Sequence, residues 1–219
     1  MGSKGGGAPF DKKEKSIGVV IMTAIIDYGA GNLRSVKNAL DYLGAENTVT
    51  SDPDAILNAD RVILPGVGAF GGAMSSLAKT GLDKTIISAV KSGKPLLGIC
   101  LGLQLMFEES EESPGVKGLG IFKGKCVKIP DRGLKIPHMG WNSLEKAKAS
   151  RLLGNDGEYV YFVHSYYLTT PEPEIISAYT EYGERLGVAV ERGSVFAVQF
   201  HPEKSGEAGL NMLKRFLAL

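Results

Sequence analysis

A cysteine at position 100 lies between two glycines, Gly98 and Gly102, where an apolar stretch gives way to a helical pattern. The spacing G-x-C-x-G is a cysteine counterpart of the G-x-S-x-G nucleophile elbow, in which small neighbours permit a tight strand-to-helix turn. A helix that starts here supplies partial positive charge and free N–H groups, which favour a thiolate and can bind an oxyanion. The position therefore suits a nucleophile.

A thiol at this position needs a base, because a free cysteine is only a few per cent thiolate at neutral pH. His201 follows an apolar stretch, and Glu203 stands two residues later across a proline whose ring restrains the backbone. Cys100, His201 and Glu203 can thus form a triad in this chain order. His138 and His164 are the remaining histidines, and neither has a carboxylate two residues on.

The segment "LPGVGAFGGAM" at residues 64–74 places glycines after another apolar stretch, where backbone N–H groups can approach a reacting carbonyl. Taken alone, each of the three features has an ordinary structural interpretation, namely a buried core cysteine, a loop and a turn. All three stand at the ends of predicted strands, where ligands collect in α/β sheets, and their joint occurrence favours an active site. Cys126 lacks such a setting and is predicted to lie in the core.

The elements that would position these residues alternate between two periodicities. Short, continuous apolar runs at 23–27, 61–65 and 95–100 are typical of strands buried on both faces of a parallel sheet. Helical spacing separates them over 33–43, before a glycine, and over 82–90. This alternation predicts a doubly wound, mostly parallel α/β sheet.

The second half of the chain has strand patterns with short joins, which are more typical of added antiparallel strands. A final amphipathic helix is predicted over 205–219, with Leu210, Leu213 and Leu217 on one face. The predicted strands of this half cover residues 126–130, 159–163, 176–180, 187–193 and 196–200.

Composition limits the classes of function. The chain of 219 residues has 25 Lys and Arg against 24 Asp and Glu, and no run of one sign that could follow a nucleic-acid backbone. The acidic segment at 107–113 is predicted to be a solvated helix end and loop. The two cysteines of the chain lie far apart in the sequence, which suggests neither a disulfide framework nor a zinc site and fits a reducing cytoplasm.

The N-terminal segment mimics a signal peptide only loosely. Its apolar run at 17–26 lacks a small-residue cleavage site and is too short to span a bilayer, which needs about 20 residues. We expect residues 1–21 to be a flexible leader or an added extension, Met22 to be the native start, and 22–219 to form one domain.

Residues 23–219 resemble the triad-type, class I glutamine amidotransferases through the segments G-I-C-L-G-L-Q, P-G-V-G-A-F and F-H-P-E-K-S. More narrowly, I-D-Y-G-A-G-N, P-H-M-G-W-N, Y-F-V-H-S-Y-Y and the acidic F-E-E-S-E-E-S loop are similar to the glutaminase subunits of imidazole glycerol phosphate synthases. The resemblance implies a flavodoxin-like fold with added antiparallel strands. It also implies an enzyme of histidine biosynthesis that forms a heterodimer with a (β/α)₈-barrel cyclase subunit and channels ammonia to it. It implies no metal or organic cofactor, no nucleic-acid or membrane partner, and a cytoplasmic location.

The resemblance also assigns roles to residues. It implies that Cys100 attacks the side-chain amide of glutamine to form a γ-glutamyl thioester, that His201 carries the proton and that Glu203 holds His201. The implied oxyanion donors are the N–H of Leu101 and the Val67–Gly68 peptide. Glutamine would be bound by Gln104 and by backbone around Gly68, Ser165 and Tyr166. The partner would be met by Asn32, Trp141 and Lys204, with His138 as a structural or interface residue and His164 shaping the pocket.

Two other functions stay open at this point. The same chemistry could serve guanylate, anthranilate, carbamoyl phosphate or pyridoxal phosphate synthesis, which P-H-M-G-W-N disfavours and which co-purification with a synthase would decide. A small cysteine-elbow protein acting as a stress-response chaperone or peptidase is disfavoured by the H-P-E segment, and an assay for glutamate release would decide that case.

Overall fold

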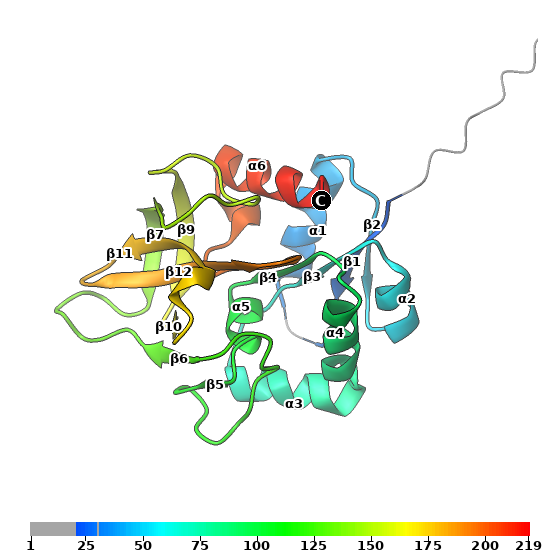
Figure 1. Cartoon of the computed structure of the whole chain (residues 1–219), viewed down its shortest axis with the longest axis horizontal. Coiled ribbons are helices and arrows are strands. Elements are labelled where there is room, and N and C mark those ends of the chain that lie inside the picture. The colour runs from blue at the N-terminus through cyan, green and yellow to red at the C-terminus, as the bar shows by residue number, and fades with distance from the viewer. Residues whose placement is uncertain (1–20, 30) are drawn as a thin grey trace, which may run out of the picture.

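The computed structural model describes residues 21–29 and 31–219, so the predicted leader at 1–21 lies almost entirely outside the described residues. Figure 1 shows a mixed sheet with helices on both faces. In the first half the elements are β1 (Thr23–Ile26), α1 (Leu33–Tyr42), β2 (Asn47–Thr50), α2 (Pro53–Asn58), β3 (Arg61–Leu64), α3 (Phe70–Thr80), α4 (Leu82–Lys91), β4 (Leu96–Ile99) and α5 (Leu101–Leu105). In the second half they are β5 (Glu109–Ser110), β6 (Lys125–Lys128), β7 (His138–Ser143), β8 (Glu145–Lys146), β9 (Tyr159–His164), β10 (Tyr166–Thr169), β11 (Ile176–Glu181), β12 (Arg185–Arg192), β13 (Val195–Val198) and α6 (Gly206–Leu217), with short 3₁₀ helices η1 (Pro173–Ile175) and η2 (Pro202–Lys204).

The strands β2, β1, β3, β4 and β13 lie side by side in this order and pair in parallel. Alternate residues of these strands divide the core into two clusters. Ile26 and Leu64 share one cluster with apolar residues of α2, α3, α4 and α5, whereas Ile25 and Leu97 share the other with α1 and α6. The parallel strands are thus covered on both faces, and the prediction of a doubly wound sheet is confirmed.

The strand predicted at 196–200 differs from the expectation. It is β13, which pairs in parallel with β4 and antiparallel with β12, so it is not an antiparallel addition. All of its residues are buried, and a strand buried on both faces belongs to the middle of a sheet. It therefore joins the parallel half to the antiparallel strands beyond it.

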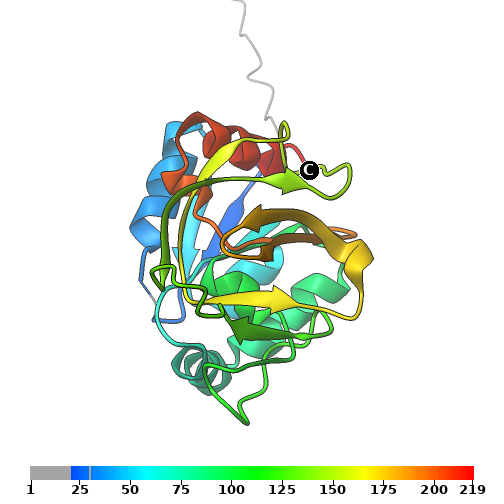
Figure 2. The ribbon, with the colours of Figure 1, turned by 90° about the vertical axis from the view of Figure 1, so that its left-hand side faces the viewer.

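The remaining strands of the second half pair antiparallel, as predicted, apart from the short β5, which pairs in parallel with β6. β12, β10 and β6 follow β13 across the main sheet, and β11 also pairs with β12. β7 and β9 form a separate two-stranded sheet. Figure 2, seen from the side on which β6 to β12 are labelled in Figure 1, shows these strands in front of the parallel half.

Helix α6 closes the described chain, as predicted, but its buried face is turned slightly from the expected one. Leu213 is buried together with Met212 and Phe216, whereas Leu210 and Leu217 are only partly buried against the same cluster. The large Phe216 side chain sets the centre of this face. α6 also begins close to η2, which carries Glu203.

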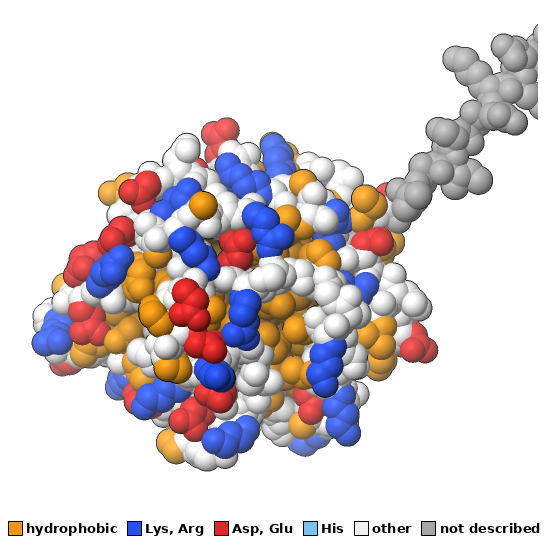
Figure 3. Space-filling model, in the orientation of Figure 1, with side chains coloured by type: hydrophobic (Ala, Val, Ile, Leu, Met, Phe, Trp, Pro, Cys, Tyr) orange, Lys and Arg blue, Asp and Glu red, His pale blue; other side chains and the backbone are white. Residues whose placement is uncertain are grey.

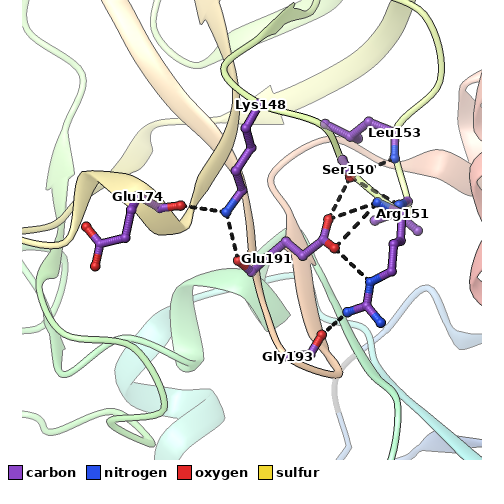
Figure 4. Close-up of polar contacts among 8 residues, drawn as sticks. Lys148, Ser150, Arg151, Leu153, Glu174, Glu191 and Gly193 are labelled. Atoms are coloured by element: carbon purple, nitrogen blue, oxygen red, sulfur yellow. Dashed lines mark hydrogen bonds and ion pairs between the residues drawn. The ribbon is translucent and has the colours of Figure 1, made fainter.

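A polar network ties the loop before β9 to strand β12 (Figure 4). The Glu191 carboxylate accepts hydrogen bonds from Ser150 Oγ at 2.7 Å and from the Arg151 Nε at 3.1 Å. Lys148 Nζ donates to the Glu191 carbonyl oxygen at 3.1 Å, and the Arg151 guanidinium lies 4.9 Å from the centre of the Phe196 ring. The network holds this loop against the β12–β13 hairpin, whose second strand leads to His201.

On the face shown in Figure 3, acidic and basic side chains are interspersed, and apolar side chains lie between them in small groups. This distribution agrees with the balanced charge of the sequence. No helix within residues 21–29 and 31–219 has the length and apolarity needed to cross a membrane.

Candidate active site

Cys100 occupies a strained corner between β4 and α5. Its backbone has φ 55° and ψ −108°, a conformation that non-glycine residues rarely adopt and that is typical of nucleophile elbows. Close packing against backbone requires glycine at 102, and tight contacts favour it at 98. A Cβ at Gly102 would lie 1.9 Å from the Leu64 carbonyl oxygen, and one at Gly98 would lie 2.8 Å from the Met106 methyl group. The predicted elbow is therefore present, and its glycines let the turn pack against the neighbouring strand.

Helix α5 is shorter than the sequence pattern suggested. It ends at Leu105, because the carbonyl groups that would continue it bond elsewhere: Leu119 N–H donates to Leu105 O at 2.8 Å, and Phe122 N–H donates to Met106 O at 3.0 Å. A helix of 5 residues contributes little macrodipole. Stabilisation of an anion at this corner must therefore come from individual N–H groups.

His201 and Glu203 lie at the end of β13 and on η2, where their side chains meet in the interior. His201 Nδ1 lies 2.8 Å from Glu203 Oε1, and the two side chains are 1% and 0% exposed. The carboxylate fixes a proton on Nδ1, so that Nε2 is the nitrogen available for proton transfer. Within the described part of the chain, Nε2 is buried and has no hydrogen-bond partner.

Asn32 completes this arrangement, which sequence reasoning did not foresee. Its Nδ2 donates to Glu203 Oε1 at 2.6 Å, from the residue that precedes α1. The Glu203 oxygen thus accepts from both Asn32 and His201. A carboxylate held from two sides orients the imidazole more firmly than one held by the histidine alone.

The electrostatics of His201 favour its charged form. Burial disfavours the imidazolium, but the Cys100 sulfur and the Glu203 carboxylate favour it more strongly and raise the pKa of His201 to about 9. His201 is therefore mostly protonated at neutral pH. A protonated His201 is the form that can give a proton to a departing group.

A second buried polar side chain, Gln199, contacts the Cys100 sulfur. Its Nε2 donates to Cys100 Sγ at 3.7 Å, and its Oε1 accepts from Gln104 Nε2 at 3.1 Å. Gln104 Nε2 also donates to the Tyr166 carbonyl oxygen at 3.3 Å. Gln199 is fully buried and directly follows β13, and the one trace of it in the sequence is a polar residue inside the apolar run at 196–200.

Cys100 and His201 open into one pocket of about 320 Å³. It gathers residues that the sequence placed in three separate segments. Within residues 21–29 and 31–219, no three His, Cys, Asp or Glu side chains are grouped so that they could hold a metal ion. The pocket is lined by Val67, Gly68, Cys100, Leu101, Gln104, Glu112, Pro137, Val163, His164, Ser165, Tyr166 and His201.

The acidic segment at 107–113 is more than the solvated loop that was predicted. Glu112 lines the pocket, and its carboxylate accepts from Phe70 N–H at 2.7 Å, at the start of α3. Gly71 N–H donates to Ser113 Oγ at 3.0 Å. These bonds satisfy free N–H groups at the helix start, so that the glycine-rich segment is helical from Phe70 onward, where no helix was predicted.

Residues 65–68 form the part of the glycine segment that faces the elbow. The Leu101 N–H, a predicted oxyanion donor, is occupied here by the Gly66 carbonyl oxygen at 3.4 Å. Gly68 has φ +102°, and a Cβ there would have no neighbour within 4 Å. The buried Tyr28 hydroxyl donates to Pro65 O at 3.0 Å and fixes the start of the segment.

The other predicted residues fall in different surroundings. Trp141 is 55% exposed and lies edge-on to Tyr161, which the exposed Lys204 also approaches. His138 is only 2% exposed, so a role as a surface contact is wrong for its side chain and the structural role applies. His164 lines the pocket but contacts His138 instead of Glu203.

Comparisons with known proteins identify the family of the chain. A family model described as glutamine amidotransferase class-I matches residues 24–219. The imidazole glycerol phosphate synthase subunit HisH of Methanothermobacter thermautotrophicus is 52% identical over 199 residues, which cover 90% of this chain and 98% of the relative. The HisH subunit of Chlorobaculum tepidum is 50% identical over 198 residues, which cover 89% and 98%.

Among solved structures, PurLQS from Thermotoga maritima has a TM-score of 0.72 at 21% identity, covering 90% of this chain and 97% of that one. A structure described as a glutamine amidotransferase has a TM-score of 0.71 at 21% identity, with the same coverage. At such identities these likenesses show the fold alone. By the family model and the relatives together, the chain belongs to the class I glutamine amidotransferases and, within them, to the HisH subunits of imidazole glycerol phosphate synthase.

Proposed function

We propose that this chain hydrolyses glutamine to glutamate and ammonia, and supplies the ammonia to a cyclase subunit for imidazole glycerol phosphate formation in histidine biosynthesis. The observation that carries the proposal is that Cys100 and His201 line one pocket, with Glu203 hydrogen-bonded to His201. A volume of about 320 Å³ suits a ligand as small as an amino acid.

The first half-reaction forms the thioester. Cys100 Sγ attacks the side-chain carbonyl carbon of glutamine while the thiol proton resides on His201 Nε2. The tetrahedral intermediate carries its negative charge on oxygen, opposite the N–H groups of Leu101 and the Val67–Gly68 peptide. His201 then gives its proton to the departing nitrogen. The C–N bond breaks, ammonia leaves, and a γ-glutamyl thioester remains.

The second half-reaction restores the enzyme. A water molecule gives a proton to His201 and attacks the thioester carbonyl, and the C–S bond breaks as the sulfur departs. Glu203, held by Asn32, keeps the imidazole in one tautomer through both steps. Gln104, with the backbone of Gly68, Ser165 and Tyr166, would hold the amino-acid end of glutamine. Glu112 adds a carboxylate that suits its ammonium group.

The cyclase partner is proposed to switch this activity on. The Gly66 carbonyl oxygen occupies the Leu101 N–H, which blocks one oxyanion donor in this conformation. A long bond of 3.4 Å is a weak restraint, and glycines at 66 and 68 allow the peptide planes between them to turn. A partner that prefers the turned segment would couple its own state to glutamine hydrolysis.

The surface around the pocket suits such a partner. Val67, Met139 and Trp141 are exposed apolar side chains, at 39%, 57% and 55%. Met139 and Trp141 point to the same face of β7, and the exposed Lys204 lies beside Tyr161 next to Trp141. Exposed apolar side chains beside a basic one are typical of a protein contact. We assign this face of β7 to the contact with the (β/α)₈-barrel cyclase in a heterodimer.

The test is glutamate release by the purified chain, by its complex with the cyclase subunit, and by the complex with the ribotide ligand. We expect a low rate for the chain alone and a rise of at least tenfold, equivalent to about 1.4 kcal/mol of differential stabilisation, in the liganded complex. Absence of glutamate in all three samples would refute the proposed function. Equal nonzero rates would refute the switching alone.

A further inference from the structure

Two buried histidines outside the triad face each other across the β7–β9 pair. His138 and His164 are opposite residues in the register of these strands, and His138 Nδ1 lies 3.0 Å from His164 Nε2. On the far side, His164 Nδ1 lies 2.9 Å from the Tyr166 carbonyl oxygen. Asn142 Nδ2 lies 3.4 Å from His138 Nε2 and donates to the Glu181 carbonyl oxygen at 2.8 Å. These contacts form one continuous row of hydrogen bonds from Tyr166 to Glu181.

The chemistry of the groups fixes which atom donates and which accepts in each of these hydrogen bonds. A carbonyl oxygen only accepts, so His164 Nδ1 carries a hydrogen and its Nε2 is the acceptor. His138 Nδ1 must then donate to His164, which leaves His138 Nε2 to accept from the Asn142 amide. Each ring is thus the neutral Nδ1–H tautomer. Protonation of either ring would place two N–H groups against each other.

The surroundings keep both rings neutral. His138 is stacked between Tyr182 and Phe162, with ring centres 3.9 and 4.7 Å away. Burial lowers the pKa of His138 to about 4 and that of His164 to about 3. In His164 the nearby His138 and His201 act in the same direction. Neither ring can serve as a base that competes with His201 at neutral pH.

The row of hydrogen bonds through His138 and His164 ends at the wall of the glutamine pocket. Tyr166 O receives hydrogen bonds from His164 on one side and from Gln104, at 3.3 Å, on the other. The preceding carbonyl oxygen, that of Ser165, accepts from Ile129 N–H at 2.9 Å. The peptide groups on both sides of Tyr166 are therefore held in place, and these are backbone groups that line the pocket.

From this geometry we infer that His164 is a positioning residue for glutamine, which fixes the backbone at Ser165 and Tyr166, and that His138 holds His164 in the required tautomer. The inference rests on the proposed function, because it assigns the ligand of the pocket as glutamine. This role concerns the binding of glutamine and not the bond-making steps, since the hydrogen bonds of the two rings go to each other, to Asn142 and to Tyr166 O, and not to Cys100. Its loss should therefore raise KM more than it lowers kcat.

Steady-state kinetics of the cyclase complex test the inference with three variants. His164→Leu removes the donor to Tyr166 O and should raise the KM for glutamine at least tenfold, with kcat within threefold of the wild type. His164→Asn can place an amide N–H near the Nδ1 position and should restore KM to within threefold. His138→Phe keeps the aromatic stack and removes the donor to His164, so KM should rise by a smaller factor of about three to five.

Tyr167→Phe is the matched control, because Tyr167 follows Tyr166 in β10 but is not among the residues that line the pocket. The substitution removes only a hydroxyl group, which donates a hydrogen bond to Glu184 at 2.6 Å. It should leave KM and kcat unchanged. A fall in kcat at constant KM for His164→Leu, or equal defects in the Leu and Asn variants, would overturn the positioning role.

A spectroscopic measurement decides the tautomers without reference to activity. In ¹⁵N spectra of histidine-labelled complex at pH 7.5, His138 and His164 should both appear as neutral Nδ1–H tautomers, and His138→Phe should shift the His164 Nε2 resonance. A neutral Nε2–H form of either ring, or a charged one, would overturn the inference even if glutamine hydrolysis proceeds as proposed. Absence of glutamate release by the wild-type complex would refute the proposed function. The tautomer pattern would still test the row of hydrogen bonds through His138 and His164.

Discussion

Alanine at Gly68 is expected to increase the glutaminase activity of the chain in the absence of its partner. In the present conformation Gly68 has φ +102°, which an L side chain disfavours, and a Cβ would meet nothing within 4 Å. The substitution therefore adds backbone strain to this conformation without a steric clash. Turning the Val67–Gly68 peptide changes φ at residue 68, so that the strain is relieved in the turned segment.

The size of the effect follows from the strain alone, because the Leu101–Gly66 hydrogen bond is present in the wild type as well. Strain at such a position costs about 1–3 kcal/mol and is absent from the turned segment. It should therefore raise the population of the turned segment roughly 5- to 150-fold. Glutamate release by Gly68→Ala alone should rise within this range, and the additional stimulation by the partner should shrink by the same factor.

The assay compares partner-free and partner-bound rates at saturating glutamine for Gly68→Ala and for Gly157→Ala. Gly157 also has positive φ, +77°, and open space around a Cβ, so its alanine variant carries comparable strain far from the elbow. It should lose stability without a change in glutamate release. An unchanged or lower partner-free rate in a folded Gly68→Ala protein would refute the assignment of this conformation as the blocked one.

Two further predictions concern the triad. Asn32→Gly keeps the backbone unstrained at φ 72° and removes the hydrogen bond to Glu203. We expect kcat/KM to fall roughly 10- to 100-fold and the free energy of unfolding to fall by about 1.5–3 kcal/mol. Unchanged kinetics would show that Asn32 does not position Glu203. Because the folded pKa of His201 is about 9, above its ordinary 6.5, its protonation stabilises the fold fully below pH 6.5, and this contribution is lost as pH rises through 9. In urea titrations from pH 6 to 10, the stability of the wild type should therefore fall relative to that of His201→Asn by on the order of 1–3 kcal/mol, and a constant difference would contradict the raised pKa.

The sheet was predictable where hydrophobic pattern alone decides structure. β1, β3 and β4 are buried along their whole length, and their continuous apolar runs predict strands of this kind. β2 was missed because its residues are only partly buried and carry no such run. The glycine-rich start of α3 was missed because tertiary bonds from Glu112 and Ser113 stabilise it, against its own low helix propensity.

The candidate site divides in the same way. Cys100, His201 and Glu203 stand in local motifs, so their residue types and short spacings could be read directly. Asn32 was expected only as a partner contact, and neither its contact with Glu203 nor that of Gln199 with Cys100 could be found in this way. The Asn32–Glu203 contact spans 171 positions and the Gln199–Cys100 contact spans 99, and single-sequence patterns carry no information at such separations.

Cys100 is the proposed nucleophile of a glutaminase that feeds ammonia to a partner. The most direct measurement compares glutamine-dependent and ammonia-dependent synthesis by the complex carrying Cys100→Ala, with Cys126→Ala as the matched control because Cys126 is the other, fully buried cysteine. Loss of a nucleophile should lower the glutamine-dependent rate by several powers of ten, while external ammonia bypasses the thiol and sustains its reaction. A Cys100→Ala complex that keeps a tenth of its glutamine-dependent rate, or a Cys126→Ala complex that loses it, would contradict the account.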